Sequence, residues 1–202
     1  RLVMVDKAEQ IPQAWAAGEV PLLFCACYKT VEEDASRVAF LRKLGVRMFT
    51  WSSNRRNVLC DGCGERSPSG LSHLGVAVAH ELERNGILPD VSHLSDASFW
   101  DLVQNTKGPI VASHSNTRAI QPSARNLGDD QIKAIADRGG FIGTSTYPTL
   151  VSTQKPSVEI LADHVMHIGR LVGFEYVAIG TDMTGFLGNL FDATIHRIDP
   201  SG

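Results

Sequence analysis

Two histidines end two apolar stretches of the sequence in nearly the same way. His93 lies in DVSHLSD (residues 90–96) and His114 lies in SHSNTR (residues 113–118), each after a run typical of a buried strand. A neutral imidazole is a good zinc ligand, and barrel hydrolases gather such ligands from strand ends because those ends are rigid. The sequence therefore favours a metal site containing both histidines. The alternative is a pair of histidines that only hydrogen-bond backbone groups at the edge of the core.

Three other polar residues are candidates for handling a small charged substrate. Arg125, in PSARNL, carries a guanidinium that can bind a carboxylate with two bonds, although a lone loop arginine is also common in surface ion pairs. Asp182, in GTD, could carry a proton in catalysis, bind a metal or anchor a substrate amine; it could also accept bonds only from its own turn. Tyr147 ends another strand-like run and is a third candidate for substrate binding.

The remaining histidines and the cysteines have weaker claims to a metal. His164 and His167 have an i, i+3 spacing that could chelate a metal, but no H-E-x-x-H pattern accompanies them, and we expect them at a helix surface or core edge. The cysteines, in FCAC (24–27) and CDGC (60–63), could form a Cys₄ zinc site or could be buried as small apolar residues. The isolated histidines are expected to be structural: His73, His80 and His196.

These candidates require parallel strands that end at one face. Apolar, β-rich runs occupy six segments: 21–27, 46–51, 87–92, 109–113, 141–147 and 176–181. Stretches with helical periodicity lie between them: 31–44, 72–86, 95–106, 129–138 and 157–172. The expected N-caps and helix-ending glycines are Ser72, Ser95, Gly45, Gly86 and Gly139. The alternation predicts an α/β fold with parallel strands.

A (β/α)₈ barrel of the TIM type is favoured over an open doubly wound sheet, because no glycine-rich nucleotide-binding motif opens any helix. Six strands are fewer than the eight that closure needs. We therefore predict a single, incomplete barrel domain of a metallo-hydrolase over residues 1–202, lacking its first strands and clipped at the C-terminus. Residues 54–70 are expected to form a functional loop, and residues 183–202 a loop with a partial helix.

Composition and charge argue against several classes of partner. The net charge is −3 and no block of Lys or Arg occurs, so neither nucleic acid nor an anionic membrane is expected. No apolar run reaches the roughly 18 residues needed to span a bilayer, and residues 1–10 lack the apolar region of a signal peptide. These features and the sparse cysteines lean toward the cytoplasm, and a start at Arg1 is consistent with a fragment boundary.

Several stretches together resemble the membrane dipeptidase (renal dipeptidase) family, peptidase family M19. They are LRKLGVRMFTW, DGCGERSPSGLSHLG, ERNGILPDVSHLSDASFWDL, GPIVASHSNTRAI, ARNLGDDQIKAIADRGGFIG and the strand ending in GTD, within residues 20–185. The resemblance implies a (β/α)₈ barrel with two zinc ions, bridged by a glutamate and a hydroxide that attacks the peptide bond of a dipeptide. It implies that His93 and His114 bind one zinc, that Arg125 grips the substrate carboxylate, and that Asp182 contacts the substrate amine.

The sequence departs from the family pattern at four places. The H-x-D pair of the first barrel strand does not occur upstream of Leu22, the bridging glutamate falls at Ala26, a position that is often histidine falls at Ser53, and the second aspartate of the last motif is Thr184. Two functions stay open. One is a zinc-dependent dipeptidase, impaired by truncation and loss of the bridging glutamate, with two zinc ions as in the family, or one or none.

The other function is a catalytically inactive barrel that acts as a binding or scaffold module. In either case an incomplete barrel would expose two strand edges. We therefore expect poor solubility of the monomer, or a homodimer formed through those edges.

Overall fold

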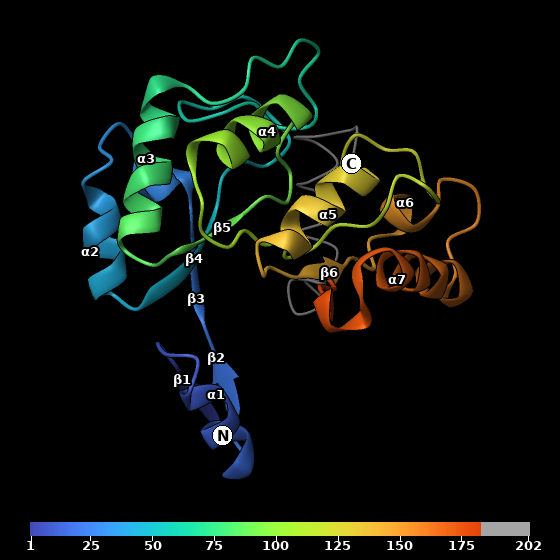
Figure 1. The fold of residues 1–202 in the computed structure, drawn as a ribbon, viewed down its shortest axis with the longest axis horizontal. Coiled ribbons are helices and arrows are strands. Elements are labelled where there is room, and N and C mark those ends of the chain that lie inside the picture. The colour runs from blue at the N-terminus through green and yellow to red at the C-terminus, as the bar shows by residue number, and fades with distance from the viewer. Residues whose placement is uncertain (183–202) are drawn as a thin grey trace, which may run out of the picture. The chain divides into compact units, whose positions relative to one another are not determined.

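The computed structural model describes residues 1–182, so Thr184 and the loop and helix predicted for residues 183–202 lie outside the described residues. The chain divides into two compact units, residues 1–111 and residues 112–202 (Figure 1). Each unit is described by itself below. The prediction of a single barrel domain over residues 1–202 stays a prediction.

The first unit contains two small parallel sheets. In one, β1 (Leu2–Met4) connects through α1 (Gln10–Ala16) to β2 (Val20–Leu22) and pairs with it. In the other, β3 (Phe24–Cys27), β4 (Val46–Thr50) and β5 (Leu88–Asp90) lie in that order. The run predicted as one strand over 21–27 is therefore two strands with different partners, and the elements before residue 20 were not predicted.

Four helical segments complete the first unit: η1 (Tyr28–Thr30), α2 (Arg37–Lys43), α3 (His73–Arg84) and α4 (Asp96–Asn105). Figure 1 shows α2 and α3 side by side, flanking the sheet that contains β4. The predicted N-caps are confirmed, since Ser72 Oγ accepts from Gly75 N at 3.0 Å and Ser95 Oγ accepts from Ser98 N at 3.1 Å.

The helix predicted from residue 31 begins only at Arg37. Asp34 Oδ1 accepts hydrogen bonds from the backbone N and the hydroxyl of Ser36, at 2.9 and 2.7 Å. Such local side-chain bonds offer the backbone an alternative to the helix. The helix therefore forms only after this turn, and Gly45 follows its end with φ +94°.

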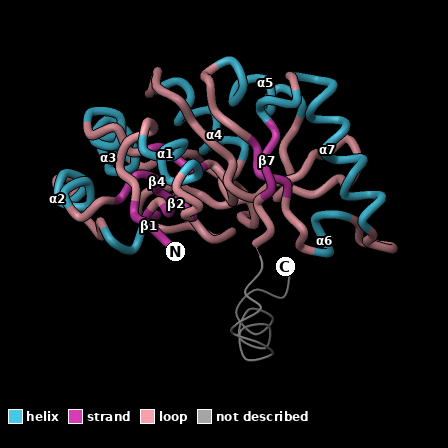
Figure 2. The backbone as a smooth tube through the Cα atoms, turned by 90° about the horizontal axis from the view of Figure 1, so that it is seen from below, coloured by secondary structure: helices cyan, strands magenta, loops and turns pink. Residues whose placement is uncertain are grey.

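Over residues 112–182, the second unit contains one pair of parallel strands, β6 (Ile142–Thr144) and β7 (Val177–Ile179). Its helices are α5 (Asp129–Asp137), α6 (Pro148–Val151), α7 (Val158–Val172) and η2 (Phe174–Tyr176). Figure 2 shows α5 and α7 near β7, and α7 contacts both strands and α5. The short helix α6 was not predicted, because its four residues are too few to show helical periodicity.

The segment predicted as a strand over 109–113 makes only isolated bridges. Within the first unit Val111 pairs with Asp90, and within the second Ala112 pairs with Ile142. A single bridge to each partner is too short to form a regular strand. The hydrogen bonds nevertheless have the parallel pattern: Val91 N donates to Val111 O at 2.7 Å, and Gly143 N donates to Ala112 O at 2.7 Å.

The α/β class with parallel strands is confirmed, but residues 1–182 form three separate sheets and no closed barrel. Each unit buries its own apolar core, with Phe49, Trp51 and Phe99 in the first, and Ile132, Ile142 and Ile168 in the second, all essentially without exposed surface. Among the described residues no helix is long and apolar enough to cross a bilayer.

Candidate active site

His93 stands just beyond the C-terminal end of β5, in a backbone conformation that is unusual for its type. Its φ is +74°, in the left-handed region that non-glycine residues rarely adopt. Its carbonyl accepts hydrogen bonds from Ser52 Oγ at 3.0 Å and from Cys63 N at 2.8 Å. The end of β4 and the loop that follows it therefore hold the backbone of His93 in this conformation.

The imidazole of His93 is oriented by an asparagine from the loop that follows β4. Its Nδ1 lies 2.6 Å from Asn54 Oδ1. Because an amide oxygen can only accept a hydrogen bond, Nδ1 carries the proton and the ring lone pair is on Nε2. Outer partners of this kind fix the tautomer of metal-binding histidines. Ser53, at the position that is often histidine in the family, is exposed beside Asn54.

The loop predicted over residues 54–70 is ordered around a buried carboxylate. Asp61 accepts two bonds from Arg56, with Nε at 2.5 Å and Nη2 at 2.9 Å, and a third from Ser69 N at 2.5 Å. The hydrogen bonds from Arg56 are the main reason that the pKa of Asp61 is lowered. The carbonyl of Asp61 also accepts from Ser98 Oγ at 2.8 Å, so the loop is fastened to the first turn of α4.

His114 follows the 109–113 segment in the second unit, and glycines allow the chain to pass close to the strand pair. A Cβ on Gly143 would lie 2.1 Å from Ser113 O, and one on Gly180 would lie 1.9 Å from the same oxygen. Any side chain at either position would push this segment away. The Nδ1 atom of His114 lies 2.6 Å from Ser113 Oγ, so its ring also has a neighbour that orients it.

Arg125 is buried beside His114, with 6% of its surface exposed. Its Nη1 donates to Ser115 Oγ at 2.7 Å and its Nη2 donates to the carbonyl of His114 at 2.8 Å. The alternative of a solvated loop arginine in a surface ion pair is therefore wrong. The guanidinium, the candidate anchor for a substrate carboxylate, instead hydrogen-bonds the backbone of His114, a candidate metal ligand.

Tyr147 and Asp182 follow the paired ends of β6 and β7, where Thr144 pairs with Ile179. Tyr147 is half-buried and its N–H donates to Ser145 Oγ at 3.2 Å. Asp182 is exposed, with φ +54°. The carbonyl of Thr181, next to it, accepts from Thr146 Oγ1 at 2.7 Å. In the second unit, Tyr147 and Asp182 thus lie just beyond the ends of β6 and β7, and Arg125 lies beside His114. That these residues form one substrate site stays a prediction.

Two buried asparagines near this group were not predicted from the sequence. Asn116, fully buried, donates from Nδ2 to Ser145 O at 3.0 Å and accepts at Oδ1 from Ser145 N at 2.9 Å. Asn126 donates from Nδ2 to Gln121 O and to Leu150 O, both at 3.0 Å. In the sequence, Asn116 directly follows SHS and Asn126 directly follows Arg125. A single polar residue is not part of a periodic pattern, so neither could be picked out.

His164 and His167 do not form a chelating pair. His164 is fully buried; its Nδ1 accepts from Thr117 N at 3.2 Å, so its Nε2 donates to Val151 O at 3.0 Å. Burial lowers the pKa of His164. His167 Nε2 instead lies 2.8 Å from Asp129 Oδ1. His164 is a core residue and His167 a surface residue, in agreement with the structural interpretation.

The Cys₄ zinc interpretation is wrong. All four cysteines fall among the described residues, and no group of three or more His, Cys, Asp or Glu side chains there could hold a metal ion. Cys60 is buried and its thiol donates to Trp51 O at 3.4 Å, and burial raises its pKa to about 12. The thiol of Cys63 donates to Asn54 Oδ1 at 3.2 Å.

The strand register also bears on the predicted bridging position at Ala26. Ala26 pairs with Phe49, whose side chain is fully buried. Successive side chains of a strand point to opposite faces, so Cys25 and Cys27 lie on the other side. Cys25 Sγ lies 3.4 Å from Thr50 Oγ1, which donates to Asp90 Oδ2 at 3.1 Å. Ala26 thus lies on the face of β3 opposite to Cys27, Thr50 and Asp90, and its assignment as the bridging position stays a prediction.

Comparison with known proteins settles the family. The sequence profile described as membrane dipeptidase (peptidase family M19) matches residues 1–192. The chain belongs to this family. The match includes β1 and α1, which lie outside the stretch that carried the resemblance in the sequence.

Curated relatives agree with this assignment. Dipeptidase tcpJ of Claviceps purpurea is 29% identical over 190 residues, covering 92% of this chain and 45% of that protein. Dipeptidase verJ of Clonostachys rogersoniana is 32% identical over 149 residues, covering 73% of this chain and 38% of that protein. The chain thus spans less than half the length of these two relatives.

Solved structures show the same fold. An amidohydrolase from Pseudomonas aeruginosa superposes with a TM-score of 0.87 at 27% identity, covering 97% of this chain and 61% of that one. A metallo peptidase from Rhodobacter sphaeroides, liganded with a phosphinate mimic of the dipeptide L-Ala-D-Ala, gives a TM-score of 0.83 at 25% identity, covering 91% and 56%. The fold is thus that of M19 metallo-hydrolases, of which this chain carries a part.

The family implies a metal, and the two histidines fit one in their chemistry. Both rings have a hydrogen-bond partner at Nδ1, as metal-binding histidines commonly do. Within residues 1–182, however, three or more suitable side chains are nowhere grouped tightly enough to form a complete ligand set. The fit therefore extends to His93 and His114 as individual ligands.

Proposed function

We propose that this protein is a zinc-dependent dipeptidase in which His93 and His114 bind zinc. The observation that carries the proposal is the bond between His93 Nδ1 and Asn54 Oδ1, at 2.6 Å, in a chain that matches the dipeptidase family over residues 1–192. A histidine that only bonded nearby backbone groups would not need Asn54, itself held in the left-handed backbone region, to orient its ring. When bound, zinc supplies a water of lowered pKa and polarises the carbonyl of the substrate.

The remaining site residues would bind the two ends of a dipeptide. Arg125 binds the substrate carboxylate, which its planar fork suits, and its bond to the carbonyl of His114 couples that end of the substrate to the metal ligand. Asp182 binds the substrate amine and holds a proton near it, and Tyr147 contacts the substrate from the end of β6. Charged anchors at both ends select short peptides over long ones.

The alternative is an inactive binding module, which the alanine at the expected bridging position, Ala26, supports. The match to the dipeptidase family over residues 1–192 favours hydrolysis instead.

Zinc content and hydrolysis together test the proposal. Protein purified without chelators is analysed for zinc by elemental analysis as wild type, His93→Ala, His114→Ala and the matched control His73→Ala, since His73 is exposed at the start of α3. We expect one or two zinc ions per chain in the wild type and the control, and less in both site variants. Hydrolysis of L-Ala-D-Ala is then measured with added zinc. A wild type without zinc, or site variants that retain it, would refute the proposal.

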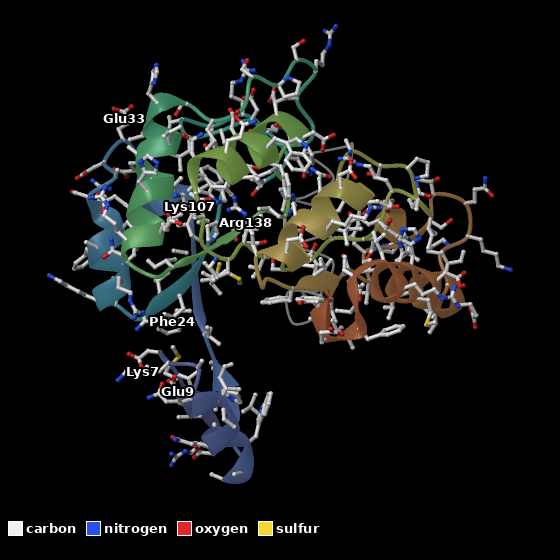
Figure 3. The ribbon with its side chains drawn as sticks, in the orientation of Figure 1. Lys7, Glu9, Phe24, Glu33, Lys107 and Arg138 are labelled. Atoms are coloured by element: carbon white, nitrogen blue, oxygen red, sulfur yellow. The ribbon has the colours of Figure 1, made fainter. Side chains whose placement is uncertain are left out.

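A homodimer is the assembly that we propose for this chain. The N-terminal strands expose apolar side chains, among them Val20, Leu23 and Phe24, the last labelled in Figure 3 and 50% exposed. β3 is the outer strand of its sheet, and such edges pair readily with other chains. Sedimentation velocity should show a dimer that Phe24→Lys shifts toward monomer; a sharp monomer at all concentrations would contradict this.

A further inference from the structure

Asn54 and His93 form a pair with two unusual features in common. They are 39 residues apart in sequence, yet Asn54 Oδ1 and His93 Nδ1 lie 2.6 Å apart. Both backbones are left-handed, with φ +67° for Asn54 and +74° for His93. Such conformations cost about 1–3 kcal/mol and persist only where the surroundings impose them, which happens most often at functional sites. Two of them joined by a short hydrogen bond indicate a geometry that is selected rather than incidental.

The neighbours of the Asn54 amide define its orientation. Oδ1 lies 3.2 Å from Sγ of Cys63, whose thiol donates to it, and 2.6 Å from Nδ1 of His93. An amide nitrogen in the same place would set its own protons against the thiol proton. The oxygen therefore faces His93, and because an amide oxygen only accepts, the ring is the Nδ1–H tautomer.

The loop holds the backbone of Asn54 beside His93. Gly64 N donates to Asn54 O at 2.7 Å, and a Cβ on Gly62 would lie 2.2 Å from the carbonyl carbon of Asn54. Cys63, between these glycines, donates its N–H to His93 O. Asn54, residues 62–64 and His93 thus close a ring of contacts that keeps the two backbones close together.

We propose that Asn54 is a positioning residue that holds His93 in the Nδ1–H tautomer and so makes Nε2 the atom that binds metal. The proposal deepens the proposed function, because the metal is the zinc assigned to His93, but the tautomer itself is a property of the metal-free protein. In water the Nε2–H form of neutral histidine is the commoner one, and that form would place the proton on the atom that must bind zinc. Asn54 removes this competition before the metal arrives.

Three variants separate the side chain of Asn54 from its backbone. Asn54→Gly deletes the amide but tolerates the left-handed backbone. Asn54→Asp keeps an oxygen acceptor and should keep the tautomer. Asn85→Ala is the control, because Asn85 caps α3 through the carbonyl of Glu81 and leaves the loop untouched.

The first readout is the tautomer of His93 in metal-free, ¹⁵N-histidine-labelled protein, read from long-range ¹H–¹⁵N NMR spectra at pH 8 and assigned with His93→Ala. We expect Nδ1–H in the wild type, in Asn54→Asp and in Asn85→Ala, and a shift toward Nε2–H in Asn54→Gly. An Nε2–H wild type would overturn the proposal without any variant. So would a folded Asn54→Gly protein in which His93 keeps Nδ1–H.

The second readout is zinc affinity, measured by competition with a chromophoric chelator. Loss of an outer partner of this kind typically weakens metal binding by about 10- to 100-fold, and we expect that loss in Asn54→Gly and near wild-type affinity in Asn54→Asp and Asn85→Ala. Equal zinc affinity in wild type and Asn54→Gly would overturn the role toward metal. A tautomer that shifts as expected in a protein that binds no zinc would uphold the positioning by Asn54 and refute the proposed dipeptidase site instead.

Discussion

Replacing Asp61 tests whether the 54–70 loop depends on one buried carboxylate. Asp61 is 3% exposed and accepts three hydrogen bonds, two from Arg56 and one from Ser69 N. Asp61→Ala removes all three. The bond from Ser69 N to a charged acceptor contributes about 1.5 kcal/mol. The pair with Arg56 adds only about 0.5 kcal/mol, because the arginine side chain is 55% exposed and solvent screens the charge.

We therefore expect Asp61→Ala to lower the free energy of unfolding by about 2 kcal/mol, and Asp61→Asn, which keeps one acceptor oxygen, by about 1 kcal/mol. The effect should depend on pH in a defined direction. The hydrogen bonds from Arg56 hold the pKa of Asp61 below its ordinary value in the folded protein. The carboxylate thus stabilises the fold fully above its unfolded pKa of about 3.9, and that stabilisation is lost as the pH falls through the lower folded value.

Urea unfolding followed by tryptophan fluorescence measures the loss, and hydrogen exchange at the amides of Ser69 and Cys63 shows whether it begins in the loop. Asp34→Ala is the matched control: Asp34 also has a lowered pKa because of bonds from Ser36, but it is exposed. The reasoning is refuted if the two alanine variants lose equal stability at pH 7. It is also refuted if the gap between wild type and Asp61→Asn is the same at the acid limit of the folded protein as at pH 7.

Three further changes should separate core groups from surface groups. His164→Ala should lower the free energy of urea unfolding by about 3 kcal/mol, because it leaves Thr117 N and Val151 O without their partner, whereas His167→Ala should lower it by under about 1 kcal/mol. Because burial lowers the pKa of His164, the stabilising effect of this residue should fade as the pH falls below about 6.5. Equal losses from the two variants would contradict this. Burial raises the pKa of Cys60 to about 12, so this thiol should resist iodoacetamide in the native protein and react only after unfolding. Mass spectrometry of the labelled peptides measures this. Labelling of Cys60 at the same rate as Cys63 would refute its burial. Gly143→Ala should lower the stability of the fold by more than about 2 kcal/mol, because the new Cβ would overlap Ser113 O. Gly139→Ala should lower it by only about 1 kcal/mol, because Gly139 has φ +71° but open space around it. The reverse order in thermal melts would show that the chain does not pass Gly143 this closely.

Periodicity and helix-end signals located most helices but could not locate short local bonds. Ser72 and Ser95 cap their helices as predicted, since a cap depends on one residue and the three that follow it. The helix predicted from residue 31 failed because Asp34 bonds Ser36, a competition that hydrophobic periodicity does not register. The run over 21–27 failed differently, because the change of partner from β1 to β4 is a tertiary event that leaves no mark on the apolar pattern.

Identity and orientation of the candidate ligands were also predictable to different degrees. Motifs identified His93 and His114, because a ligand must have a particular side chain. Counting along the chain by motif puts the bridging position at Ala26, but it does not show which face of a strand a residue occupies, and a shift of one residue reverses the face. That assignment stays a prediction. Motifs did not indicate Asn54 or Asn116, since an asparagine that orients another residue acts through a single contact far along the chain.

The segment with the least regular sequence decides the geometry of His93. Residues 54–70 have no period, yet they supply the amide that meets the ring and the N–H that meets the carbonyl of His93. A loop can hold a candidate ligand in place only if the polar groups of the loop have hydrogen-bond partners. The carboxylate of Asp61 accepts hydrogen bonds from Arg56 and Ser69 N. The carbonyl of Asp61 accepts from Ser98 and so attaches the loop to α4. Loss of Asp61 should therefore disturb the His93 ring as well as stability, so that the tautomer measured for Asn54→Gly should appear in part in Asp61→Ala.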